Sequence, residues 1–291
     1  MNKVLLIGGT GLVGSRIIQL LDKKFEFIAP SHEQLDVLNP ELVLQAVENI
    51  KPSSVLYAAG FTNVDLAEGK EQECFALNSK APGYFVEATK KAKIPFYYLS
   101  TDYVFDGEKS DAPYTEDDLP NPLDQVYAKS KYEGEQVVLG ASPINSVLRI
   151  IVPFSAVFTK KLDLARLFVS KLKNNEKISG IYNQKINPVF VDDLVAALGK
   201  ILEARASGIY HIAATDFTTP YGYAKTVARV FGFDEGLIEK VDYEDYVKTR
   251  RAKRPQDTWL DTHKFRKEFG EGILHTVEEE IEAFKSQFIP K

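Results

Sequence analysis

The 291-residue sequence contains only one cysteine, one methionine and one tryptophan. A single cysteine, Cys74, excludes an intramolecular disulfide and a zinc site built from several thiolates, so we expect it to be an inert core residue. No stretch approaches the roughly 18 consecutive apolar residues of a membrane-spanning helix. The apolar VLLIGG near the start is too short for a signal peptide and has no cleavage site after it. These absences predict a cytoplasmic protein without a membrane partner.

Excess charge of one sign is also missing. The chain has 36 lysines and arginines against 41 acidic residues, which gives a net charge of −5, and we find no run dense in basic residues. This balance argues against an electrostatic surface for nucleic acid. The hydrophobic fraction of 44% and the charged fraction of 26% are typical of soluble globular proteins. We therefore expect small molecules as partners, with a homodimer as one further option.

Short apolar runs alternate with helix-length segments in the first half of the chain. Runs such as KVLLIG (3–8), SSVLYAAG (53–60) and PFYYLST (95–101) are apolar throughout, as strands buried on both faces are. The alternation predicts an α/β fold with a Rossmann-type doubly wound parallel sheet. Beyond about residue 150, helical patterns predominate. We predict an NAD(P)-binding domain over 1–150 and a smaller mixed α/β, mainly substrate-binding lobe over 151–291, interleaved with late elements of the first domain.

Three glycines follow the first predicted strand in IGGTGLVGS. Gly8 permits a tight turn, Gly11 lets backbone N–H groups approach a pyrophosphate, and Gly14 allows close packing of helix on strand. The start of the helix then adds partial positive charge for the phosphates. The alternative is a glycine-rich turn that merely begins a helix. In the dinucleotide interpretation, the neighbouring cofactor-binding residues are Thr10, Leu12 and Val13.

The second predicted strand ends without the acidic residue that would bind a ribose 2′-hydroxyl. Pro30, Ser31 and His32 stand there, so a 2′-phosphate is tolerated, and Arg16 and His32 are the available cationic or donor groups. This favours NADP(H) as cofactor and leaves NAD(H) open, since both side chains are equally consistent with solvated surface residues. Asp36, with Val37, suits a loop beneath the adenine, or else a helix cap.

A tyrosine and a lysine share one helix face in DQVYAKSKY. Tyr127 and Lys131 are four residues apart, so both can point into one cleft. A phenol has a pKa of about 10, and an ammonium group beside it would stabilise the phenolate. Thr101 ends the run FYYLST, at the strand end where open α/β sheets place their ligands. The alternative interpretation of YAKSK alone is an exposed helix face.

Four segments together resemble the extended short-chain dehydrogenase/reductases, and among these the dTDP-4-dehydrorhamnose reductases. They are GGTGLVG (8–14), YAAGFTNVDLAE (57–68), LSTDYVFDG (99–107) with YAKSKYEGE (127–135), and RPQDTWLD (254–261). Related 4,6-dehydratases carry a glutamate after the Thr-Asp pair, whereas Tyr103 follows Asp102 here. The resemblance therefore implies simple ketone reduction rather than elimination or epimerisation.

The resemblance also implies roles for particular residues. NADPH would deliver hydride to C4 of a nucleotide-linked 4-keto-6-deoxy sugar while Tyr127 gives a proton to the nascent alkoxide. Lys131 would keep the phenol acidic and hold the nicotinamide ribose, Thr101 would complete the catalytic set, and Asp102 would lie close to the sugar. Asn78 matches a family asparagine or is a helix cap. Further implied residues are Ala58, Ala59, Gly60 and Ser100 for the cofactor, and Thr62, Val64, Tyr103, Phe105 and Arg254 for the substrate, with a structural ion pair as the alternative for Arg254.

The sequence departs from this family in one segment after the fifth predicted strand. LRIIVPFS (148–155) stands where an LRTSWVYG-like segment is common, so the tryptophan expected near the sugar is missing and the sugar stays open. We expect no metal site, because Arg16 lies where an acidic ligand would be wanted. Two alternatives remain at this point: an NADP-binding regulatory subunit like the β subunit of methionine adenosyltransferase, and a reductase or epimerase of another carbonyl compound.

Overall fold

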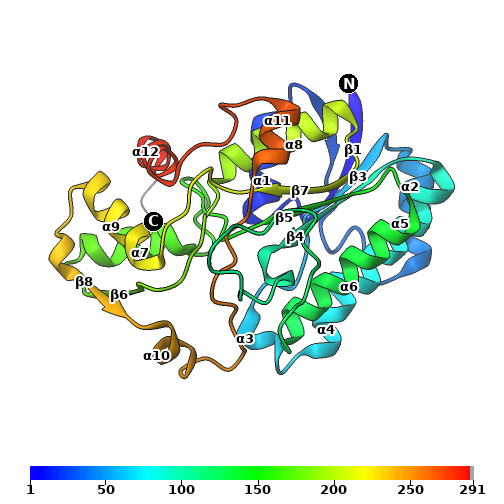
Figure 1. Ribbon diagram of the computed structural model, residues 1–291. Coiled ribbons are helices and arrows are strands. Elements are labelled where there is room, and N and C mark those ends of the chain that lie inside the picture. The colour runs from blue at the N-terminus through cyan, green and yellow to red at the C-terminus, as the bar shows by residue number, and fades with distance from the viewer. Residues whose placement is uncertain (289–291) are drawn as a thin grey trace.

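A six-stranded parallel sheet forms the centre of the molecule (Figure 1). The computed structural model describes residues 1–288. Every neighbouring pair of strands is parallel, in the order β2-β1-β3-β4-β5-β7. The predicted Rossmann-type fold class is confirmed. The strands are β1 (Asn2–Ile7), β2 (Phe25–Ile28), β3 (Ser54–Tyr57), β4 (Phe96–Thr101), β5 (Ser146–Ile150) and β7 (Gly208–Ile212).

Helices cover both faces of this sheet because successive strand residues point to opposite sides. In β1, Val4 and Leu6 enter one apolar cluster, and Leu5 and Ile7 enter another. On the second side, α2 (Pro40–Ile50), α5 (Ala81–Ala92) and α6 (Val126–Ala141) pack in succession (Figure 1). The first side carries α1 (Leu12–Leu21), α8 (Val191–Ala204) and α11 (His263–Phe269).

Short helical segments connect the strands near the site. After β3 come α3 (Val64–Ala67), α4 (Glu71–Phe75) and the π-helical turn η1 (Ala76–Lys80), which leads directly into α5. The 3₁₀ turn η2 (Asp102–Val104) follows β4. Among the helices of residues 1–288, none combines the length and apolar character that a bilayer span requires.

A smaller lobe lies at one end of the sheet (Figure 1). It contains a two-stranded parallel sheet with helices packed against it. After α7 and β6 the chain returns to the main part of the molecule, where α8 packs on the first side of the sheet and β7 joins the edge of the sheet. It then enters the lobe again. The division at residue 150 stays a prediction. The elements of this part are α7 (Leu164–Lys173), β6 (Ile178–Ile181), α9 (Pro220–Phe231), η3 (Glu235–Leu237), β8 (Ile238–Val241), α10 (Tyr243–Val247) and α12 (Val277–Gln287).

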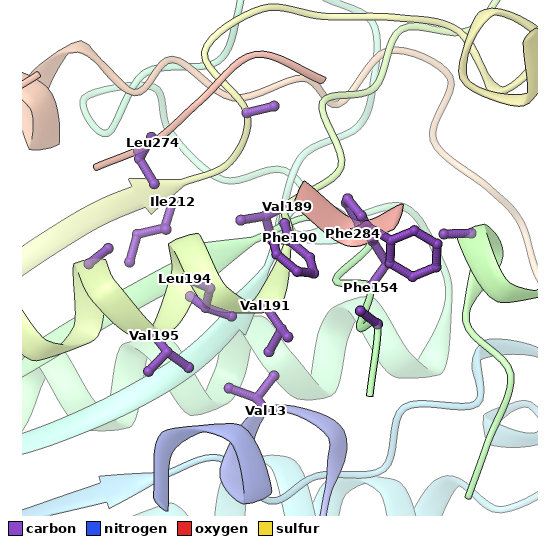
Figure 2. Close-up of a cluster of buried hydrophobic side chains, with 14 of the residues drawn as sticks. Val13, Phe154, Val189, Phe190, Val191, Leu194, Val195, Ile212, Leu274 and Phe284 are labelled. Atoms are coloured by element: carbon purple, nitrogen blue, oxygen red, sulfur yellow. The ribbon is translucent and has the colours of Figure 1, made fainter. Parts of the chain in front are cut away.

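The two parts of the molecule share one apolar core. Figure 2 shows Val13 of α1 facing Val191 of α8, with Phe154, Phe190 and Phe284 gathered beside them. The phenylalanine rings pack at centroid distances of 5.4 Å between Phe154 and Phe190 and 5.6 Å between Phe154 and Phe284. Such contacts fix rotamers and exclude water, so the lobe is held rigidly against the sheet.

A buried ion pair attaches α6 to β5. Arg149 Nη2 donates to Glu135 Oε2 at 2.7 Å and Arg149 Nε donates to Oε1 at 3.0 Å, and both side chains are 1% exposed. The guanidinium also lies 4.9 Å from the centroid of the Phe105 ring. A buried charge whose partner is removed has neither water nor a counter-ion, so this pair is costly to break on one side.

We predict that Arg149→Met lowers the free energy of unfolding by about 3–5 kcal/mol, because the Glu135 carboxylate is left buried and unpaired. The double variant Glu135→Gln/Arg149→Met recovers most of this loss. Urea unfolding followed by circular dichroism measures both. The control is Lys24→Ala, which breaks the exposed Lys24–Glu203 pair and changes stability by about 0–1 kcal/mol. An Arg149→Met midpoint equal to that of the control would contradict the prediction.

Candidate active site

The strand order reverses at the carboxyl end of β1. From β1 the chain continues to β2 on one side, whereas β3 lies on the other side, which is the position where open α/β sheets bind ligands. The loops after β1 and β3 approach each other closely there. A Cβ atom on Gly8 would lie 2.7 Å from the Ala59 nitrogen. Only glycine fits at this contact.

The glycine loop has the geometry that the sequence predicted for a phosphate-binding turn. Gly8 has φ +93°, and its carbonyl accepts a hydrogen bond from the Gly11 N–H at 3.0 Å. A Cβ on Gly14 would lie 2.2 Å from that same carbonyl oxygen, so the helix packs against the turn itself. Gly11 caps α1 without a side-chain hydrogen bond, which leaves N–H groups of the first turn available to an anion.

The neighbouring loop residues differ in what they can offer a cofactor. Thr10 is exposed and Leu12 is half-buried, so neither side chain is fully enclosed by the protein. Val13 is buried in the core (Figure 2), so only its backbone can face a ligand.

The loop after β2 presents a histidine to solvent. His32 is exposed, while the Ser31 N–H donates to the Gln34 side chain at 2.8 Å. Asp36 Oδ1 accepts from the Leu38 N–H at 2.9 Å, and the cap of α2 is Asn39, so the helix-cap interpretation of Asp36 is wrong. Val37 beside it is half-buried.

Arg16 is held in a structural ion pair. Its Nε and Nη2 atoms donate to Asp192 at 2.6 Å each, and Nη2 also donates to Gln287 Oε1 at 2.6 Å. This geometry ties α1 to α8 and α12. It corrects the expectation that Arg16 is available to a 2′-phosphate, because its donors already have partners.

Asn78 organises the loop after β3. Its Oδ1 accepts from the Phe61 N–H at 2.8 Å, and its Nδ2 donates to the Phe61 carbonyl at 3.1 Å and to Ser130 Oγ at 3.0 Å. The residue therefore does not cap a helix. It fixes the segment that follows the half-buried Ala58, Ala59 and Gly60, and it connects this segment to α6.

Thr101 and Tyr127 meet at the end of β4. Gln125 caps α6 by accepting from the Ala128 N–H at 2.7 Å, which sets the start of the helix that carries Tyr127. Burial raises the pKa of the Tyr127 phenol above its usual value, and the neighbouring Thr101 hydroxyl acts in the opposite direction. The structure thus places these two predicted catalytic groups near each other, where α6 packs against the end of β4.

Lys131 lies on the same helix face but contacts β4. Its Nζ donates to the Leu99 carbonyl at 2.6 Å and lies 4.0 Å from the centroid of the Tyr98 ring. Burial lowers the pKa of Lys131 to about 7. We expected its ammonium to keep the phenol acidic, but here the pKa of Tyr127 is raised, because burial outweighs the neighbouring hydroxyl.

Asp102 is buried behind Thr101. Its Oδ1 accepts from Thr101 Oγ1 at 3.0 Å, and its Oδ2 accepts from Thr258 Oγ1 at 2.5 Å. Burial raises the pKa of Asp102 to about 7, against the effect of both hydroxyls. Asp102 as a residue is 3% exposed, and its proximity to the sugar stays a prediction. Thr258, whose partner is 156 residues away, was not identified from the sequence.

The predicted substrate residues fall into two groups. Thr62 is exposed, Val64 begins α3, and the Tyr103 ring meets the Tyr127 ring edge-on at 5.8 Å. The expectation that Phe105 contacts the substrate is wrong, because its side chain is fully buried. It stacks on Tyr114 at 4.1 Å, so it has no surface to present to a ligand.

A basic cavity lies beside α10. It has a volume of about 390 Å³ and shares Leu123, Tyr243 and Arg254 with a neighbouring cavity of about 320 Å³. Arg254 Nη2 pairs with Asp65 Oδ2 at 2.8 Å while lining both. The segment KTRRAKR (248–254) supplies five cationic residues, so the statement that the sequence has no basic run is wrong. Within residues 1–288, no three acidic, histidine or cysteine side chains gather where they could hold a metal ion.

Comparison with known proteins places this site in a family. The model described as "RmlD substrate binding domain" matches residues 1–288. The chain is 30% identical over 288 residues to dTDP-4-dehydrorhamnose reductase of Aggregatibacter actinomycetemcomitans, covering 93% of this chain and 94% of that protein. It is 26% identical over 277 residues to methionine adenosyltransferase 2 subunit beta of Rattus norvegicus, covering 90% and 81%.

A solved structure shows the same fold. The structure of dTDP-4-dehydrorhamnose reductase from Bacillus anthracis in complex with NADP superposes with a TM-score of 0.90 at 24% identity, covering 98% of this chain and 99% of that one. The resemblance predicted from the sequence motifs is confirmed. The chain belongs to the RmlD substrate binding domain family.

Proposed function

We propose that this protein uses NADPH to reduce the C4 keto group of a nucleotide-linked 4-keto-6-deoxy sugar. The observation that carries the proposal is the position of the Tyr127 phenol near Thr101 at the end of β4, where the Tyr103 ring contacts the Tyr127 ring at 5.8 Å. Two hydroxyl groups in this position can hold and protonate a carbonyl oxygen. The names of the reductase relatives support the substrate class.

The chain's own residues fit a dinucleotide. The turn from Gly8 to Gly14 leaves backbone N–H groups for a pyrophosphate, and Ser31 and His32 would meet a 2′-phosphate. Ser100 Oγ, near the end of β4, is buried and has no hydrogen-bond partner among the described residues. A buried hydroxyl without a partner is costly, so a ligand that reaches it is favoured. When bound, NADPH supplies the hydride.

Tyr127 acts as the proton donor. Its raised pKa keeps the phenol protonated at neutral pH, so a proton is present when the carbonyl oxygen gains negative charge. The phenol O–H bond then breaks and the new alcohol O–H bond forms. The nearby Thr101 hydroxyl would favour the phenolate that remains. Lys131, once released from the Leu99 carbonyl, would bind the ribose.

The basic cavity supports recognition of a diphosphate. The cations of 248–254 would neutralise the phosphate charges of a sugar nucleotide, and Arg254 would exchange its ion pair with Asp65 for two phosphate oxygens. We also infer that the enzyme acts in the cytoplasm. A chain with one cysteine cannot form an intramolecular disulfide, so its fold does not require an oxidising environment. A homodimer stays a prediction.

A partner subunit without its own turnover is the second candidate. One relative is named as subunit beta of methionine adenosyltransferase 2, and it aligns with 90% of this chain. This alternative requires no proton transfer from Tyr127. Removal of the Tyr127 hydroxyl should therefore abolish the reductase function and leave the partner-subunit function intact.

We predict that Tyr127→Phe lowers kcat for ketone reduction by about 100-fold or more, because the variant keeps the ring but cannot donate a proton. Oxidation of NADPH is followed by absorbance with a panel of 4-keto sugar nucleotides. Tyr132→Phe, five residues further along α6, is the matched control and keeps wild-type activity. If no ketosugar is reduced and the wild-type protein instead copurifies with a synthetase, the partner-subunit function is correct.

The coenzyme preference gives a second prediction. Wild-type protein binds NADPH more tightly than NADH, and His32→Ala weakens NADPH binding by about tenfold while leaving NADH binding unchanged, because only NADPH carries the 2′-phosphate. Nucleotide fluorescence titration measures all four affinities. Glu33→Ala, at the exposed neighbouring position, is the control. Equal affinities of the wild-type protein for the two coenzymes would refute the role of Ser31 and His32.

A further inference from the structure

A tyrosine ring of β4 lies against the ammonium group of Lys131. Lys131 Nζ is 4.0 Å from the centroid of the Tyr98 ring, and it donates a hydrogen bond to the Leu99 carbonyl at 2.6 Å. Lys131 is 5% exposed and Tyr98 is fully buried, so water is largely excluded from this contact. The face of an aromatic ring carries negative potential, which attracts a cation most strongly where water is absent.

The carboxylate nearest along the helix does not take the place of this ring. Burial lowers the pKa of Lys131 to about 7, and the charge of Glu135, one turn further along α6, acts in the opposite direction. Both oxygens of Glu135 accept from the Arg149 guanidinium, at 3.0 and 2.7 Å. Within residues 1–288, Glu135 forms its ion pair with Arg149 and none with Lys131.

The other ionisable side chains around the ring are neutral at physiological pH. Burial raises the pKa of the Cys74 thiol from α4 and of the phenols of Tyr57 from β3 and Tyr127 from α6. None of them therefore supplies a negative charge for the lysine. The Tyr98 ring and the Leu99 carbonyl are the groups in contact with the ammonium.

The position of the Tyr98 ring is fixed by its surroundings. Its hydroxyl donates to the Asn78 carbonyl at 2.6 Å, and its ring packs against Tyr57 at a centroid distance of 6.1 Å. A Cβ on Gly134 of α6 would lie 2.6 Å from the Tyr98 hydroxyl oxygen and closer still to the Asn78 carbonyl oxygen. Only glycine lets α6 approach this closely, so the helix that carries the lysine is seated on the ring.

We propose that Tyr98 is a positioning residue, whose ring holds the Lys131 side chain against β4 and stabilises its charged form until it binds the coenzyme ribose. This inference rests on the proposed ketone reduction, in which Lys131 binds that ribose. Burial brings the lysine close to losing its proton at neutral pH, so the attraction of one ring face decides how much of it is charged. Tyr98 is fully buried, so it acts through Lys131.

The first test is the pH dependence of kcat in Tyr98→Leu and Tyr98→Phe. In the wild-type protein kcat falls as the pH rises through about 7, because Lys131 loses its charge. Tyr98→Leu moves this fall downward by about one pH unit, since the charged form loses the ring that stabilises it. Tyr98→Phe keeps the ring face and restores the wild-type profile. A wild-type profile in Tyr98→Leu would overturn the proposal.

Tyr57→Leu is the matched control. Tyr57 is paired with Tyr98 in the register of β3 and β4, is fully buried, and donates its hydroxyl to the Leu77 carbonyl at 2.8 Å. Within residues 1–288 no lysine or arginine lies over its ring. The control loses a comparable amount of core packing and leaves the pH profile unchanged. Equal displacement of the profile in Tyr57→Leu and Tyr98→Leu would show a merely structural role and overturn the proposal.

A substrate-independent measurement distinguishes failure of this inference from failure of the proposed function. Side-chain NMR of lysine-labelled protein follows the titration of Lys131, with Lys131→Met assigning its resonance. We expect a midpoint near pH 7 that falls in Tyr98→Leu and is retained in Tyr98→Phe. An unchanged midpoint in Tyr98→Leu would overturn the inference even in an active reductase. The expected shift in a protein that reduces no ketosugar would support the contact between ring and lysine and refute the proposed function.

A fluorinated ring tests the same contact without creating a cavity, which matters if Tyr98→Leu does not fold. Trifluorophenylalanine incorporated at position 98 is close in shape to phenylalanine, but its fluorines withdraw electrons from the ring face and weaken the attraction for a cation. We expect the Lys131 midpoint to fall below that of Tyr98→Phe by about half a pH unit. Equal midpoints would overturn the proposal.

Discussion

Burial of polar groups beneath α6 is the constraint on which the chemistry of this molecule depends. The helix lies against β4 and β5, and it removes water from Tyr127, Lys131 and Asp102 at once. Loss of water disfavours every charged form, so the acids become weaker and the ammonium becomes more acidic. The pKa values of Asp102 and Lys131 are thereby brought to about 7, whereas the phenol of Tyr127 is held in its neutral form. The Glu135–Arg149 pair keeps α6 in this position.

The site depends equally on contacts between distant parts of the sequence. Thr258 reaches Asp102 from the C-terminal half, and Arg254 pairs with Asp65 of α3. These contacts can form only because the lobe and the sheet share an apolar core, in which Phe154 and Phe284 pack together (Figure 2). Rigid packing of that core therefore has a chemical role, since small displacements of the lobe would lengthen the hydrogen bonds beneath the reacting groups.

Local sequence patterns predicted the parallel sheet, the glycine turn and the contact of Thr101 with the Tyr127 helix, because each of these follows from the periodicity of a strand or a helix. The same patterns did not predict partners chosen by tertiary packing. From the sequence we expected the Arg16 guanidinium to be available to a phosphate. In the structure it donates hydrogen bonds to Asp192 and Gln287. Phe105 lies in a segment typical of the family, yet it is buried. The basic segment 248–254 could have been found by reading the sequence alone, whereas the partnership of Thr258 with Asp102 has no local signal.

The central sheet is completed late in the chain, and this has a consequence for biosynthesis. Strand β7 forms one edge of the sheet. Gln287 of α12 accepts a hydrogen bond from Arg16 of α1, the helix that begins at the glycine turn. Most of the polypeptide is therefore synthesised before the elements around the predicted nucleotide site are complete. Until then the edge of β5 is an unpaired template for other strands. Nascent chains of this protein therefore expose the β5 edge until β7 has been synthesised, and the coenzyme cannot assist folding at an early step.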